Sequence, residues 1–371
     1  MPTVNQDLAD AAVSHAVDMH SYSNGIVRRI LALLNRTDSD LFAQLAVALE
    51  QIDTNTFTVD RLESLLVSVR QLNARVYQQI AGDLTAEMRH LVAYESGYQH
   101  RLFETTIPPQ VVTSVGVASV NAEQVYAAAL SRPFQGKLLR EFAAGIEAAR
   151  MARIRDSVRM GFVEQQTTQQ IINRIRGTRA KGYSDGIIEI DRRSAEAVVR
   201  TAIGHTAGFT RDRFYEANTD LIKAVQWVST LDTRTSSFCV IRDNLQYTPT
   251  EHKPINHSVP WLSGPGRLHF NCRSSSVPIT KSWRDLGVNI DEFSPSTRAS
   301  MDGQVPAEQS YGDWLKKQSA KRQDEVLGSA RGKLLRDGGL TVDRFYSDKG
   351  VYLSLEQLRA RDAEAFARAG V

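Results

Sequence analysis

The residues of this chain that could bind a metal or act as nucleophiles are concentrated between residues 227 and 278. Cys239 and Cys272 are its two cysteines, and three of its eight histidines lie in the same segment. Thiolates and imidazoles are preferred zinc ligands, and a cysteine beside a histidine can also act as a nucleophile. One interpretation is a pair of buried, unreacted thiols. The other is a zinc site that uses Cys239, His257, His269 and Cys272, with His252 as the alternative to His257.

Catalytic motifs are absent from this segment. It has no His-Glu-x-x-His motif, no Gly-x-Ser-x-Gly turn and no phosphate-binding loop. Asp232, Asp243 and Glu251 could join the histidines in a metal-dependent hydrolase, but their spacing matches no recognised catalytic pattern. We therefore predict that the protein is not an enzyme and keep the hydrolase as a third hypothesis.

Short strands and a loop are expected to position these side chains. Residues 222–230 alternate apolar and polar side chains around Val225 and Trp227, as a half-buried strand does. Residues 244–249 form a second extended candidate, and the proline- and glycine-bearing stretch 260–266 indicates a loop.

The module has two cysteine-bearing arms, the stretch with Cys239 that follows the first strand and the later stretch with Cys272. Charged residues flank both arms. Asp232 and Arg234 follow the first strand, and Arg273 follows Cys272. One aspartate and two arginines can form a partly buried cluster that closes the module. We expect this internal role, and the alternative is that both arginines face a partner.

The rest of the chain has the apolar spacing of helices, continuing through residues 138–160, 165–175 and 192–218. An N-terminal stripe fits intramolecular helix packing, with self-association through the N-terminal helices as the alternative, because sustained heptads are missing. The stripe consists of Leu62, Leu65, Leu66, Val69, Leu72, Val76 and Ile80.

The expected fold class is α+β, predominantly α-helical, with one small β-containing irregular module near residues 222–280. Four consecutive regions are expected. They are an N-terminal helical region (1–108), a central basic helical region (109–220), the module with both cysteines (221–285) and a C-terminal helical tail (286–371).

Length and composition are those of a soluble globular protein. The 371 residues allow two or three domains, and 42% are hydrophobic and 23% charged. We expect no transmembrane helix and no signal peptide, because apolar runs are short and the N-terminus lacks a basic start. Two cysteines do not make a disulfide framework, which indicates a reducing cytoplasm.

A basic stretch lies in the middle of the chain, although the formal net charge is only +3. Residues 137–181 hold ten Lys or Arg against four Asp or Glu, a local charge of about +6. A basic helix face can contact the phosphates of duplex DNA, and a solvated surface is the alternative. The candidate DNA contacts are Arg150, Arg153, Arg155, Arg159, Arg174 and Arg176.

The second half of the chain carries an ordered series of short motifs. W-x4-D-x-R-T begins at Trp227 and is followed by Cys239, a proline-bearing loop, H-x-x-C-R from His269 and a terminal V-P. A later stretch, Y-G-D-W-L, opens at Tyr311 and extends to Gly338. This order resembles the Mu F-like head morphogenesis family of tailed phages over roughly residues 195–360. The structural module then consists of Trp227, Asp232, Arg234, Cys239, His269, Cys272 and Arg273.

Two positions depart from that family's pattern, which commonly has two cysteines in each arm. Ser236 and Ser274 stand at the other two positions. A four-thiolate zinc site cannot form, because serine is a very poor zinc ligand. The loss of one thiol from each arm adds a third state, a disulfide between Cys239 and Cys272 formed after particle release.

The resemblance implies a non-enzymatic minor head protein that acts in capsid assembly. Its partners would be the phage portal, major capsid or scaffold proteins, and it would reside in the capsid interior or at the portal vertex after assembly in the host cytoplasm. No membrane contact and no cofactor other than the zinc alternative are expected. The alternative function is a DNA-binding protein packaged or ejected with the genome.

Overall fold

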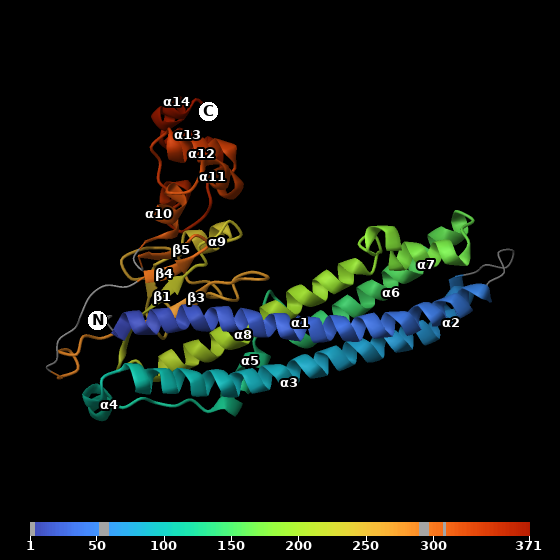
Figure 1. Ribbon diagram of the computed structural model, residues 1–371, viewed down its shortest axis with the longest axis horizontal. Helices are drawn as coiled ribbons and strands as arrows, with labels where there is room; N and C mark the ends of the chain where they lie inside the picture. Colours follow the sequence, from blue (N-terminus) through green and yellow to red (C-terminus); the bar gives the residue numbers. More distant parts are fainter. Residues whose placement is uncertain (1–3, 52–58, 289–296, 307–308) are drawn as a thin grey trace. The chain divides into compact units, whose positions relative to one another are not determined.

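The computed structural model describes residues 4–51, 59–288, 297–306 and 309–371. Helices contain 64% of the residues beside a small three-stranded antiparallel sheet, which confirms the predominantly helical α+β fold (Figure 1). The α-helices are α1 (Val4–Glu50), α2 (Val59–Leu65), α3 (Val67–Thr106), α4 (Pro109–Val115), α5 (Ala122–Ser131), α6 (Leu139–Val163), α7 (Thr168–Arg176), α8 (Glu189–Ala217), α9 (Ser237–Val240), α10 (Tyr311–Lys316), α11 (Ala320–Leu327), α12 (Ser329–Arg336), α13 (Leu355–Arg361) and α14 (Ala363–Ala369). The strands are β1 (Ile222–Val228), β2 (Gln246–Tyr247), β3 (Ser275–Thr280), β4 (Thr297–Ser300) and β5 (Gly303–Pro306). Within the described ranges, no helix combines the length and the hydropathy that crossing a membrane requires.

The chain divides into two compact units that do not follow sequence order. Unit 1 contains residues 1–19, 92–129 and 204–371, and unit 2 contains residues 20–91 and 130–203. The long helices α1, α3 and α8 each contribute one part to each unit. The units therefore differ from the four consecutive regions expected from the sequence, where each helix was assigned whole to one region.

Unit 2 contains an apolar core in which the faces of several helices meet. The N-terminal stripe supplies Leu62, Leu66 and Val69, each at most 1% exposed, and Ile154 and Ile175 join them from α6 and α7. Packing within the chain therefore accounts for the stripe, as expected, and these residues are not available as a self-association seam.

The sheet of unit 1 has the strand order β2-β1-β3, with both pairs antiparallel. β1 forms where the alternating pattern predicts it, and β2 lies within the second extended candidate. The sequence does not predict β3, because its first residues are serines and it contains Pro278. β3 lies at the edge of the sheet, where the missing N–H of a proline is tolerated. The hairpin of β4 and β5 is likewise not predicted from the sequence.

Two apolar clusters of unit 1 hold the module and the C-terminal helices. In the first, Phe103 of α3 and Phe214 of α8 pack with Trp227 of β1. In the second, Leu231 of the module packs with Trp314 and other residues of the C-terminal helices. The module and the C-terminal tail therefore share a core.

A buried ionic cluster lies inside unit 1, where α1, α3 and α8 each contribute one side chain. Arg211 Nε lies 3.4 Å from one oxygen of Glu95, and His15 Nε2 lies 2.5 Å from the other. All three residues are at most 6% exposed. Burial alone would raise the pKa of Glu95, but the hydrogen bonds and charges of His15 and Arg211 lower it. The carboxylate is therefore held in its ionised form.

Candidate functional site

The pairing of β1 with β3 brings the two cysteine-bearing arms together. Val228 at the end of β1 lies opposite Ser275 at the start of β3. Cys239 lies on α9, which follows β1, and Cys272 lies just before β3. Because one antiparallel strand ends where its partner begins, arms that are 33 residues apart meet at this edge of the sheet.

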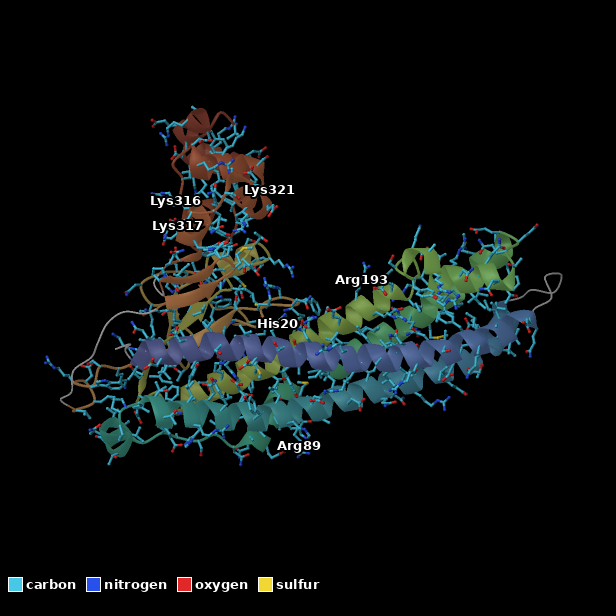
Figure 2. All side chains as sticks on the ribbon, viewed as in Figure 1. His20, Arg89, Arg193, Lys316, Lys317 and Lys321 are labelled. Atoms are coloured by element: carbon cyan, nitrogen blue, oxygen red, sulfur yellow. The ribbon has the colours of Figure 1, made fainter. Side chains whose placement is uncertain are left out.

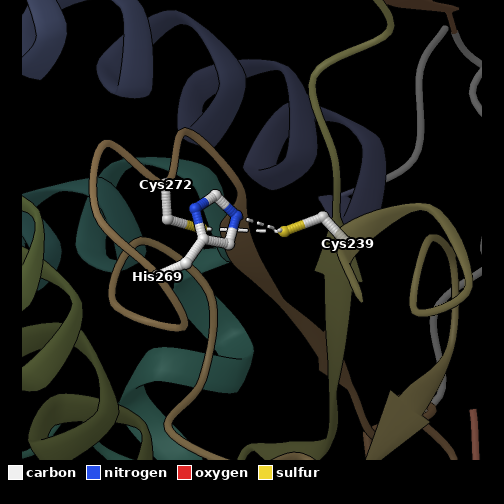
Figure 3. A group of neighbouring side chains, drawn as sticks. All are labelled: Cys239, His269 and Cys272. Carbon is white, nitrogen blue, oxygen red and sulfur yellow. Dashed lines mark hydrogen bonds between the residues drawn. The ribbon is translucent and has the colours of Figure 1, made fainter. Parts of the chain in front are cut away.

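Two thiols and one imidazole converge at this edge. Cys239 Sγ lies 3.7 Å from Cys272 Sγ and 3.4 Å from His269 Nε2 (Figure 3). All three donor atoms lie within 4.8 Å of one another, and both cysteines are free thiols. In the part of the chain that the structure describes, no other group of three or more Cys, His, Asp or Glu residues is placed to share a metal ion.

Hydrogen bonds fix the orientation of His269. Its Nδ1 lies 2.9 Å from the carbonyl oxygen of Phe270, which can only accept, so in the neutral ring Nδ1 carries the proton and Nε2 the lone pair. Ser236 Oγ lies 2.8 Å from that Nε2 and also caps α9 by accepting from the Cys239 backbone N–H at 3.4 Å. A cavity of about 10 Å³ is lined by Ser236, Cys239, His269 and Ser274 among other residues.

The two thiols titrate as a pair. The pKa of Cys272 is lowered because Cys239 donates a hydrogen bond to its sulfur and His269 lies beside it. The pKa of Cys239 is raised by the neighbouring Cys272 and by burial. Contact with Cys272 in turn raises the pKa of His269. The first thiol proton therefore leaves easily, whereas the second is retained.

The other two histidines of the segment lie elsewhere. His257 Nε2 donates to Gln246 O at 2.8 Å, and its ring meets the edge of Tyr247. The ring of His252 stacks on Trp261 at 4.5 Å between centroids. Neither His257 nor His252 therefore lies with the other zinc ligands expected from the sequence. The structure brings together only Cys239, His269 and Cys272.

The expected charged cluster forms in part. Arg273 makes a two-pronged contact with the Asp232 carboxylate, one arm of which measures 2.7 Å. Although burial acts to raise the pKa of Asp232, the Arg273 guanidinium lowers it. Arg234 is exposed and contributes its backbone N–H to Asp232 at 3.0 Å. The carbonyl oxygen of Asp232 also accepts from the Tyr311 hydroxyl at 2.7 Å, which joins the arm to the C-terminal helices.

The remaining module residues have packing roles. Trp227 is fully buried, and its ring meets the edge of Trp261 at 5.3 Å. Asp243, a carboxylate considered for a hydrolase, accepts from the backbone N–H groups of Ser229 and Tyr311, both at 2.8 Å. This role of Asp243 escapes sequence reasoning, because no local pattern links residue 243 to residue 311.

The arginines expected to contact DNA are largely paired inside unit 2. Arg150 is 2% exposed and bonds to Asp38, which also accepts from Arg192 at 2.7 Å. The prediction that Arg150 contacts DNA is therefore wrong, because a buried guanidinium cannot reach a phosphate. Arg153 pairs with Asp191, Arg155 with Glu63 and Asp156, Arg174 with Glu164, and Arg176 with Asn173 and the rings of Phe42 and Tyr183.

Exposed basic residues of unit 2 are distributed over different helices. Arg159 of α6 is exposed, as are Arg89 of α3 and Arg193 of α8, whose side chains Figure 2 labels. Exposed cations that are spread over separate helices are usual on a solvated surface. The basic stretch of the sequence therefore does not correspond to a single row of available arginines.

Comparison of the chain with protein-family models, with curated proteins and with solved structures finds no match. Its function therefore has to be inferred from its own residues.

Proposed function

We propose that this chain is a non-enzymatic minor head protein of a tailed phage, acting in head assembly through protein contacts near the portal. The observation that carries the proposal is the ordered motif series from Trp227 to Gly338, which resembles Mu F-like head morphogenesis proteins. The described parts of this series belong to one compact unit.

The motif residues have packing roles, which an assembly module requires. Trp227 and Trp314 fill the two apolar clusters, and the pair of Asp232 with Arg273 joins the arms. An enzyme would direct such polar groups toward a cavity that admits its substrate. The cavity of about 10 Å³ beside Cys239 has room for no more than about one water.

Portal, major capsid and scaffold proteins are the partners that this proposal implies, with the virion as the site of residence. The helices α1 and α3, of 47 and 40 residues, offer long faces for such contacts. DNA binding has weaker support, because Arg150 is buried and Arg153 and Arg174 already have carboxylate partners.

The proposal is tested by deleting the gene from the source phage and examining the particles by electron microscopy and mass spectrometry. We expect the chain in purified wild-type particles, and defective heads in the deletion that a plasmid copy of the gene restores. The chain should also capture portal or capsid protein of the same phage in a pull-down. Normal heads from the deletion phage, together with particles that lack the chain, contradict the proposal.

The same purified chain separates assembly from DNA binding. Affinity for duplex DNA that falls steeply with salt, and falls again in Arg159→Ala, would favour the DNA-binding alternative. Arg159 is the suitable position because it is exposed, so its replacement leaves the core of unit 2 intact.

A further inference from the structure

The thiols and the imidazole between β1 and β3 are spaced as the ligands of a tetrahedral metal ion. We propose that Cys239, His269 and Cys272 bind one Zn²⁺, which clamps the two arms of the module together. This inference rests on the geometry of the arms and is independent of the proposed role in head assembly.

The distances between the donor atoms match those that zinc requires. With Zn–S bonds of about 2.3 Å and Zn–N bonds of about 2.0–2.1 Å, tetrahedral angles place two sulfurs about 3.8 Å apart and a sulfur and a nitrogen about 3.6 Å apart. Cys239 Sγ lies 3.7 Å from Cys272 Sγ and 3.4 Å from His269 Nε2. The arms therefore need little rearrangement to accept the ion.

The histidine already has the tautomer that a metal ligand needs. Histidines that bind metals usually donate their second ring N–H to a carbonyl or carboxylate, which orients the ring and makes the other nitrogen more basic. His269 does this through Nδ1 and the carbonyl oxygen of Phe270 at 2.9 Å. Its Nε2 lies on the side of the ring that faces the sulfur of Cys239 (Figure 3).

The chemistry of the donors selects zinc over the common hard cations. Two sulfurs and one nitrogen suit Zn²⁺, whereas Mg²⁺ and Ca²⁺ require oxygen ligands. No carboxylate joins this group among the residues that the structure describes. On binding, the thiols release their remaining protons to solvent, and the cation stabilises both thiolates.

One coordination position is left for a small ligand. Ser236 Oγ, 2.8 Å from His269 Nε2, lines the cavity of about 10 Å³, which can hold about one water. A water held by Ser236 therefore completes the tetrahedron. Zinc sites with an open position are often catalytic, but a cavity of about 10 Å³ leaves little room for a substrate beside the ion, which favours a structural role.

The test is metal binding by the full chain, purified with a thiol reductant and without a chelator. We expect about one equivalent of zinc per chain by elemental analysis, and with Co²⁺ as the probe, the sulfur-to-cobalt absorption bands of a thiolate site. Cys239→Ala, Cys272→Ala and His269→Ala should each lose both signals, and His257→Ala, the matched histidine outside the group, should keep them.

A gain of function guards against variants that merely misfold. Ser236→Cys supplies a third thiolate beside His269 and should tighten zinc binding by about tenfold or more, measured by competition with a chromophoric chelator. Absence of stoichiometric zinc and of cobalt bands in the reduced wild type overturns the proposal. A disulfide between the two cysteines that persists under reductant, or metal retained by His269→Ala, overturns it as well.

Discussion

Arg150 forms an ion pair inside the core of unit 2. Its guanidinium bonds to Asp38, and Arg192 provides a second cation to the same carboxylate. A buried charge is tolerated only when it is paired and hydrogen-bonded, because the protein interior solvates it poorly. The three side chains therefore depend on one another, and removal of one leaves the others with an imbalance of charge.

Replacement of Arg150 by methionine should lower the free energy of unfolding by about 3 kcal/mol, because Asp38 loses its buried partner. Urea unfolding measures this loss. Arg159→Met is the matched control on the same helix, and its effect should stay within about 0.5 kcal/mol because Arg159 is exposed. Equal stability of the two variants would contradict the assignment.

At the scale of single residues, the sequence indicates which side chains are important. It does not indicate which residue each of them contacts. Arg150 and Arg159 belong to the same basic helix in the sequence, and what distinguishes them is Asp38, 112 residues from Arg150. His269 and Cys272 are close in the sequence and lie in the same group in the structure. Nothing local showed that His257 turns toward Gln246 instead.

At the scale of elements, one carboxylate joins the end of β1 to the start of α10. Asp243 accepts from the backbone N–H of Ser229 with one oxygen and from that of Tyr311 with the other. Both donors are buried, and an unsatisfied buried N–H costs free energy. The C-terminal helices therefore depend on a residue of the module for their attachment.

Asp243→Asn should destabilise the protein by about 2 kcal/mol. Asparagine has an NH2 group in place of one of the two acceptor oxygens, so one of the two backbone N–H groups would face a donor and lose its hydrogen bond. Thermal unfolding followed by circular dichroism should show a lower Tm. Asp348→Asn, at an exposed position, is the matched control and should leave Tm nearly unchanged. A wild-type Tm in Asp243→Asn would show that this link is dispensable.

Elements with a local signature could be predicted from the sequence. β1 follows from its alternating pattern, and Asn121 and Ser354 cap α5 and α13 as their positions before acidic first turns indicate. β3 could not be predicted, because its edge position, which tolerates Pro278, is a property of the assembled sheet.

At the scale of the whole molecule, the two units could not be predicted from the order of the sequence. Each of α1, α3 and α8 is a single uninterrupted pattern, yet part of each belongs to either unit. The cluster of His15, Glu95 and Arg211 illustrates the reason, since its members lie 80 and 116 residues from Glu95. Contacts of this range leave no local trace.

The stability of the protein should fall in acid through Glu95. The pKa of Glu95 is lowered in the folded state. Its contribution to the free energy of unfolding is therefore complete above pH 4.5, the ordinary pKa of a glutamate, and is lost as the pH falls through the pKa of the folded state. Glu95→Gln should be less stable than the wild type by about 3 kcal/mol at neutral pH. Urea unfolding at several pH values should show this difference shrinking below 4.5. A difference that is independent of pH would contradict the ionised state of Glu95.

The composition of unit 1 also sets the order in which the protein can acquire its structure during synthesis. Asn5, near the beginning of the chain, accepts a hydrogen bond from the backbone N–H of Thr280 at 2.8 Å, 275 residues later. Unit 2 ends at residue 203 and has all its segments once the ribosome has passed that point. The first turns of α1 leave the ribosome early, but the residues that pack against them are synthesised late. Their apolar side therefore stays exposed until those residues are available. A chaperone that covers this helix during translation would protect it over most of that interval.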